Sequence, residues 1–125
     1  MDVKVLDQAI GARWALYLGD AVDVAKGIPG GSIGFTIFSP PFSNLYIYSD
    51  SLADMGNSAD DEEFFKHFEF LIPELHRVTM PGRLCAVHCK DLPKYMNRDG
   101  AAGLKDFPGR IIKAFENHGW TYHSR

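Results

Sequence analysis

Four consecutive residues, Ser39, Pro40, Pro41 and Phe42, combine a hydroxyl, a stiff backbone and a flat ring. They follow an apolar run, residues 34–38, that is typical of a buried parallel strand. Each proline has a fixed φ, lacks an N–H and keeps the residue before it extended. The carbonyl groups of Ser39 and Pro40 are therefore expected to be acceptors without a ladder partner. Because ligands bind beyond the carboxyl ends of strands in open α/β sheets, this stretch predicts a site for a flat substrate with an amino group.

The tetrapeptide resembles motif IV of the S-adenosylmethionine-dependent DNA amino-methyltransferases, in which Ser, Asp or Asn precedes Pro-Pro and an aromatic residue. Those enzymes methylate the exocyclic amine of cytosine or adenine. The resemblance implies that Ser39 Oγ and the Pro40 carbonyl accept the amine hydrogens, Pro41 stiffens the loop, and Phe42 stacks on a flipped base. Serine at the first position leans towards N4 of cytosine over N6 of adenine. The alternative is a Pro-Pro turn that ends a core strand.

A second motif precedes the first. Residues 13–18 predict a short strand that ends at Gly19-Asp20, and residues 21–26 predict a helix with Asp20 as its N-cap. This order, followed by a turn and the motif IV strand, resembles the same family, whose motif III lies near the cofactor's adenine. The resemblance implies that Asp20 accepts a hydrogen bond from the adenine amino group of S-adenosylmethionine. A plain helix cap is the alternative, and both roles are compatible.

Two loops are expected at the same edge of the sheet. Residues 43–60 show no periodicity, and loops of this length are usually functional or disordered. Tyr46 in this loop is assigned to DNA contact, with ordinary packing as the alternative. Residues 91–106 form the most basic part of the chain, and Lys90 and Arg98 are assigned to DNA phosphates, with a solvated loop as the alternative.

Helical periodicity begins after an acidic start at residues 60–63, and Pro73 predicts a kink or a break. A turn at residues 80–82 and a buried strand at residues 83–89 follow. Pro108 suits the first turn of a last helix, Gly119 ends it, and residues 120–124 predict a further strand. The two helices are expected to bury one apolar face each, made by Phe64, Phe68, Leu71, Ile72, Leu75 and Val78 in the first and by Ile111, Ile112 and Phe115 in the last.

The two cysteines, Cys85 and Cys89, are predicted to be reduced thiols, since no secretory signal precedes them. Both share one strand face, whereas His88 lies on the other. No metal site is therefore predicted. His88 and Lys90 follow the carboxyl end of their strand and are candidates for lining the substrate site.

Alternation of strands and helices predicts one α/β domain over residues 1–125, a doubly wound and mainly parallel sheet. The family's glycine-rich cofactor motif is absent, so the chain resembles the N-terminal, catalytic half of a permuted enzyme that lacks the cofactor half and the target-recognition region. DNA and S-adenosylmethionine are the expected partners of that enzyme. A protein or RNA amino-methyltransferase and a non-catalytic α/β binding module are the alternatives.

Composition adds three expectations. The net charge of −3, with 13 Lys+Arg against 16 Asp+Glu, is mildly unfavourable for a DNA-binding surface. The apolar runs are too short to cross a bilayer, so a cytoplasmic protein without a membrane partner is expected. Strands at residues 13–18 and 34–38 would each lack the neighbours that they have in the complete family sheet. The chain could pair edge to edge with a second copy, swap its N-terminal strand, or leave residues 1–18 detached from the main sheet. We expect a homodimer that forms through an exposed sheet edge or through the apolar N-terminal segment.

Overall fold

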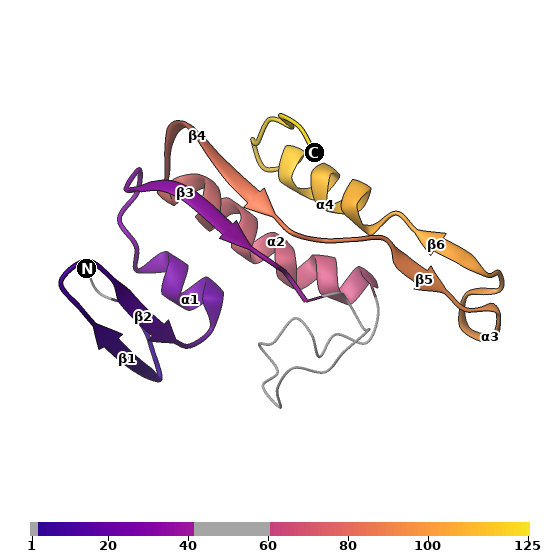
Figure 1. Cartoon of the computed structure of the whole chain (residues 1–125), viewed down its shortest axis with the longest axis horizontal. Coiled ribbons are helices and arrows are strands. Elements are labelled where there is room, and N and C mark those ends of the chain that lie inside the picture. The colour runs from indigo at the N-terminus through magenta and orange to yellow at the C-terminus, as the bar shows by residue number, and fades with distance from the viewer. Residues whose placement is uncertain (1–2, 42–60) are drawn as a thin grey trace.

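The computed structural model describes residues 3–41 and 61–125. Figure 1 shows the order of the elements along the chain. The elements are β1 (Asp7–Ile10), β2 (Ala15–Leu18), α1 (Ala21–Lys26), β3 (Ile33–Phe38), α2 (Asp61–Val78), β4 (Thr79–Val87), β5 (Leu92–Lys94), α3 (Met96–Asp99), β6 (Gly103–Lys105) and α4 (Phe107–Glu116). None of the helices in these ranges is long and apolar enough to cross a membrane.

The strands form three separate two-stranded sheets among the described residues. Only β3 and β4 are parallel, and they lie side by side in front of α2 (Figure 1). β1 pairs with β2, and β5 pairs with β6, both antiparallel. The predicted α/β class is therefore confirmed, whereas the doubly wound, mainly parallel sheet is not, since a single parallel pair is present in these ranges. β2 and β3 do not pair with each other, as expected if their common neighbours are missing.

The core lies between the β3–β4 sheet and the long helix α2. All six residues of the predicted apolar face of α2 are buried, and Phe65 is buried beside them. The Phe64 and Phe68 rings stack at 5.3 Å, and Phe68 also lies 5.9 Å from the Phe115 ring of α4. Of the kink or break expected near Pro73, the break is wrong, because α2 continues through this residue, and the kink stays a prediction. Pro73 lies on the exposed side of the helix.

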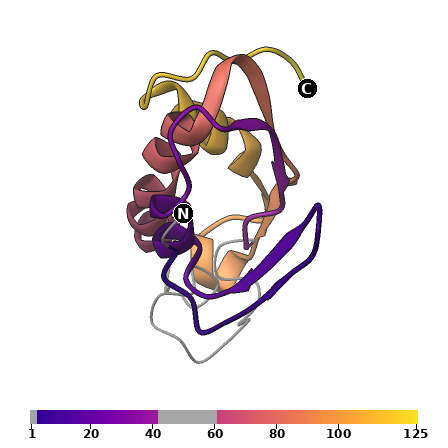
Figure 2. The ribbon, with the colours of Figure 1, turned by 90° about the vertical axis from the view of Figure 1, so that its left-hand side faces the viewer.

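The β3–β4 sheet has one covered and one open face. Phe38 points towards α2, with its ring 6.3 Å from that of Phe68. Side chains alternate along a strand, so Phe35 and Ile37 point the other way. They are 54% and 71% exposed, and Leu84, which pairs with Phe35, is 52% exposed. Figure 2 shows the helices gathered on one side of β3. α2 and α4 thus cover the same face of the sheet, since the rings of Phe38 in β3 and Phe115 in α4 both lie against Phe68.

The start of β4 differs from the prediction. The expected turn at residues 80–82 lies inside the strand, where Gly82 has a φ of 77° and the pairing shifts between Ile33 and Phe35. A left-handed residue in a strand is typical of a bulge, and glycine adopts this φ without a steric cost. The chain therefore uses this glycine to bend the strand, and not to end it.

Three further expectations are corrected or refined. The predicted strand at 13–18 is β2, which belongs to a hairpin with β1 and is detached from β3. The expected loop 91–106 contains β5, α3 and β6. Residues 120–124 do not form a strand, because no described strand pairs with them.

Candidate active site at the carboxyl ends of β3 and β4

Ser39 and His88 meet where the two parallel strands end. The register aligns Phe38 with Val87, and the His88 N–H donates to the Phe38 carbonyl at 2.9 Å. The next residue on each strand is therefore adjacent to its neighbour. Ser39 Oγ lies 3.0 Å from His88 Nδ1. The sequence placed both residues at strand ends, but it did not show that they are in contact.

Pro40 and Ser39 occupy opposite sides of the chain after β3. Pro40 is buried, whereas Ser39 is exposed on the side of Ile37. Among the described residues no backbone N–H donates to the Pro40 carbonyl. Pro41 is half-buried and completes the described part of the motif. The two prolines make the backbone rigid and extended here, and so they hold the exposed hydroxyl of Ser39 in place. The predicted residues Phe42 and Tyr46 lie outside the described residues.

Asp20 caps α1. Its Oδ1 accepts from the Val22 N–H at 3.3 Å, and its backbone has the extended φ and ψ of an N-cap. The Val24 N–H donates to the Asp20 carbonyl at 2.9 Å. Asp20 as a whole is half-exposed. The predicted capping role is confirmed, and the cofactor role stays a prediction.

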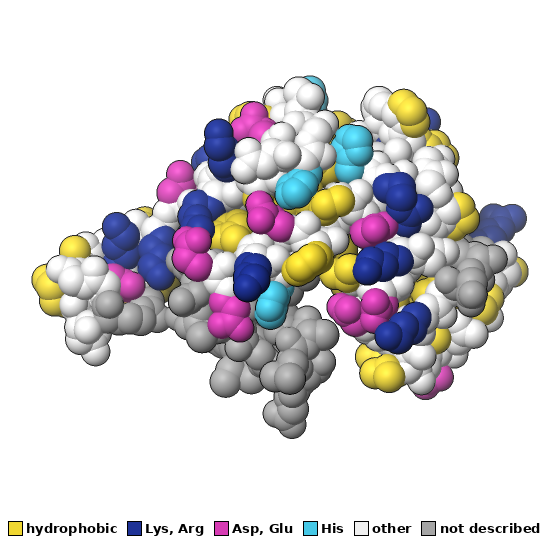
Figure 3. All heavy atoms as spheres, turned by 180° about the vertical axis from the view of Figure 1, so that it is seen from behind, with side chains coloured by type: hydrophobic (Ala, Val, Ile, Leu, Met, Phe, Trp, Pro, Cys, Tyr) yellow, Lys and Arg dark blue, Asp and Glu magenta, His cyan; other side chains and the backbone are white. Residues whose placement is uncertain are grey.

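The residues assigned to DNA phosphate lie beyond β4. Lys90 is exposed, and Arg98 belongs to α3, with a side chain outside the described part. Lys105 Nζ lies 3.7 Å from Asp99 Oδ1, so one cation of this region is paired. Figure 3 shows cationic and anionic side chains interspersed over the helix-covered face. The described side chains on that face therefore form no single-sign patch of the kind that phosphate binding favours.

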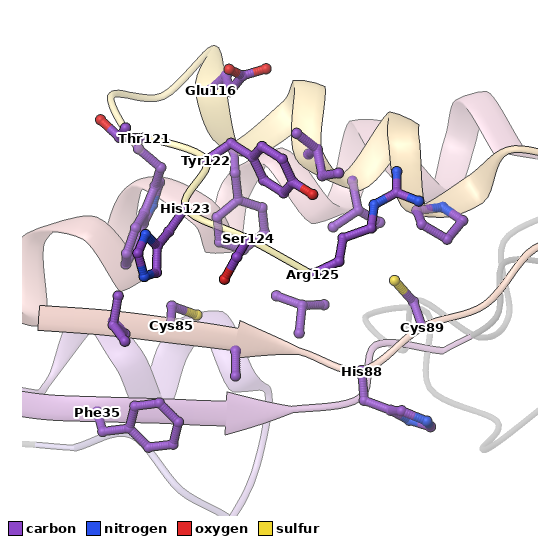
Figure 4. A pocket seen from close by; sticks show the side chains of 18 of the residues that line it. Phe35, Cys85, His88, Cys89, Glu116, Thr121, Tyr122, His123, Ser124 and Arg125 are labelled. Carbon is purple, nitrogen blue, oxygen red and sulfur yellow. The ribbon is translucent and has the colours of Figure 1, made fainter.

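A groove of about 590 Å³ lies between β4, α4 and the C-terminal residues 120–125. Figure 4 shows Cys89 pointing towards Arg125, and the ring of His88, which also lines the groove, directed away from α4. Burial raises the pKa of the Cys85 thiol from 9.0 to about 11. Burial also raises the pKa of Cys89, although Arg125 lowers it in part. Both thiols are free, and both pack against the core. Within the described ranges no three metal-binding side chains cluster.

No protein-family model matches the chain, and no curated protein matches it. Solved structures do match. Three of them are structures of TTHA0409, a "Putative DNA Modification Methylase" from Thermus thermophilus. The complex with S-adenosyl-L-methionine aligns with a TM-score of 0.61 and 22% identity over 81% of this chain and 37% of that one.

Two other structures of TTHA0409 agree with the first. The selenomethionine derivative has a TM-score of 0.59 and 20% identity, covering 81% of this chain and 36% of that one. A third structure has a TM-score of 0.59 and 21% identity, with 81% and 38% covered. The chain thus spans little more than a third of the length of TTHA0409, and over most of its own length it has the α/β fold of that methylase.

Proposed function

We propose that this chain is the motif IV part of an S-adenosylmethionine-dependent DNA methyltransferase that methylates the exocyclic amine of a base. One observation carries the proposal. Ser39 is exposed at the carboxyl end of a parallel strand, directly before a buried proline whose carbonyl receives no described backbone donor. The fold shared with TTHA0409 supports it.

The two acceptors explain how such a site acts on an amine. An exocyclic amine is a weak nucleophile because its lone pair is delocalised into the ring of the base. Ser39 Oγ and the Pro40 carbonyl accept one N–H each, which favours a pyramidal nitrogen with a localised lone pair. The lone pair then points away from both acceptors. This is catalysis by positioning and by fixed dipoles, and it needs no covalent intermediate.

The described residues fit only part of an S-adenosylmethionine site. The second carboxylate oxygen of Asp20 is suited to the adenine amino group. A glycine turn that opens a helix after a strand is the usual seat of such a cofactor. Gly31 does not provide one, since its N–H donates to the Arg77 carbonyl at 2.9 Å. Gly100 follows α3, and Gly103 is the first residue of β6, an antiparallel strand. The electrophilic methyl donor would therefore be held mainly by polypeptide outside these ranges.

We also propose N4 of cytosine as the preferred target, because serine precedes the two prolines. Lys90 and Arg98 are proposed to contact DNA phosphates, and Tyr46 and Phe42 to contact the flipped base. The chain is proposed to act within a longer cytoplasmic polypeptide that carries the cofactor turn and the recognition region.

The test is methyl transfer from radiolabelled S-adenosylmethionine to DNA, measured with the full gene product that contains this chain. Nucleoside analysis should identify N4-methylcytosine. N6-methyladenine would correct the target base alone. Label on protein or RNA instead of DNA would contradict the DNA assignment, and no transfer to any acceptor would leave a binding module as the better description. Calorimetry on the 125-residue chain alone should detect no tight binding of the cofactor.

A further inference from the structure

We propose that His88 is a positioning residue that accepts the hydroxyl hydrogen of Ser39 and so turns the Ser39 lone pairs towards the substrate amine. The inference rests on the proposed function, because it assumes that Ser39 receives an N–H from the base. It starts from the contact of 3.0 Å between Ser39 Oγ and His88 Nδ1.

The hydroxyl of serine has one hydrogen and two lone pairs. Its hydrogen rotates freely unless a nearby acceptor fixes it. A free hydroxyl in front of an amine can point its hydrogen at the amine lone pair, which would block the reacting atom. With the hydrogen directed to His88 Nδ1, both lone pairs of Oγ face away from the ring. Ser39 is then an acceptor only, as the chemistry at the amine requires.

The sheet holds the two side chains in this relation. The His88 N–H bond to the Phe38 carbonyl fixes the backbone of His88 directly beside Ser39. Ala86 is paired with Ile37, and side chains alternate along each strand, so Ser39 and His88 both fall on the open face. Figure 4 shows the His88 ring directed away from α4 and the C-terminal segment. A register shift of one residue would place His88 on the helix side and break the contact.

The proposed role requires one tautomer of His88. Nδ1 must be unprotonated to accept, so the ring hydrogen lies on Nε2. A hydrogen bond between neutral groups suffices, and the hydroxyl hydrogen stays on Ser39. His88 therefore acts through Ser39 and does not touch the base.

Kinetics of the full gene product test this role. His88→Ala should lower kcat by about tenfold to a hundredfold, the range for residues that orient a functional group, with KM for DNA changed by less than about twofold. His88→Asn, which offers an amide oxygen at a similar reach, should restore most of the lost kcat. His67→Ala, a half-exposed histidine on α2, is the matched control and should leave kcat unchanged.

A double-mutant cycle separates positioning from folding. If His88 acts only through the hydroxyl, adding His88→Ala to Ser39→Ala should lower kcat no further. Equal losses in both backgrounds would overturn the inference, and so would full activity of His88→Ala. An inactive wild-type protein would instead contradict the proposed function itself.

A spectroscopic measurement on the 125-residue chain is independent of activity. Long-range proton–nitrogen correlation spectra of the His88 ring should show a protonated Nε2 and an unprotonated, hydrogen-bonded Nδ1. Ser39→Ala should shift the Nδ1 signal and leave that of His67 in place. A proton on Nδ1 at neutral pH would overturn the assignment of Ser39 as the donor.

Discussion

The guanidinium of Arg77, near the end of α2, donates to the main-chain carbonyl of Ala25 at the end of α1, with 2.9 Å between Nη2 and the oxygen. Nη1 donates to the Ile28 carbonyl at 2.9 Å, and Nε pairs with Glu74 at 2.8 Å. The last carbonyls of a helix have no partner within it, so a cation there supplies donors and offsets the helix dipole. One side chain thus joins α1, and with it Asp20, to the core helix.

Arg77→Ala should therefore lower the free energy of unfolding by about 1–2 kcal/mol, a range reduced for the partial exposure of the side chain. Urea denaturation followed by circular dichroism measures this. Arg83→Ala, at an exposed position of β4, is the control and should change stability by less than about 0.5 kcal/mol. If both substitutions change the free energy of unfolding equally, the hydrogen bonds of Arg77 do not stabilise the fold.

Phe68 links the sheet to both long helices, since its buried ring contacts Phe38, Phe64 and Phe115. Phe68→Ala should destabilise the chain by about 3–5 kcal/mol, because it leaves a cavity in a packed core. Phe70 lies on the same helix and is 64% exposed, so Phe70→Ala is a matched control with an effect near zero. Urea denaturation measures both variants. A small effect of Phe68→Ala would show that Phe68 is not at the centre of the hydrophobic core.

Ser39→Ala should lower methyl transfer by the full gene product about tenfold to a thousandfold, as expected for the loss of one transition-state contact. The fold should be retained, because the hydroxyl is exposed and contacts only His88 among the described residues. Phe42→Ala should weaken binding of the flipped base by about 1–3 kcal/mol, the range for stacking of a base on an aromatic ring. Turnover and binding assays on DNA check both variants, and full activity in both would refute the site.

The raised pKa of Cys85 predicts how stability depends on pH. The folded thiol ionises near 11 instead of 9.0, so the unfolded state loses its proton first as pH rises. The contribution of Cys85 is therefore fully present below about pH 9 and is lost between pH 9 and about 11. Denaturation at a series of pH values should show a smaller decline in Cys85→Ala than in the wild type. Rapid alkylation of Cys85 at neutral pH in the folded chain would contradict the raised pKa.

The open face of the β3–β4 sheet predicts self-association of the isolated chain. Phe35, Ile37 and Leu84 are exposed there, and within the described ranges each of the two strands has one edge without a partner strand. Apolar surface beside such an edge favours edge pairing. Sedimentation velocity should show a dimer, and Ile37→Lys should shift it to the monomer. Leu104→Lys, at a residue of β6 that is 63% exposed, is the control and should leave the dimer intact. A wild-type monomer at all concentrations would reject this contact.

Local features of this protein follow from its sequence alone. The spacing of Phe64, Phe68 and Ile72 defines the buried face of α2, because helical periodicity depends only on near neighbours. Two prolines after an apolar run define the stiff end of β3, since they act on the backbone directly. Asp20 is identifiable as an N-cap because capping, too, involves only near neighbours in the sequence.

The pairing of the strands, in contrast, depends on the tertiary structure. Local patterns mark a strand but do not identify its pairing partner. The three separate sheets and the pairing of β2 with β1 could therefore not be predicted, although a detached N-terminal segment was among the expectations. In the sequence, the bulge at Gly82 looks like a turn, because a glycine with a left-handed backbone conformation occurs in both turns and bulges. The contact between Ser39 and His88, 49 residues apart, depends on the parallel register of β3 and β4, which is set by long-range backbone hydrogen bonds.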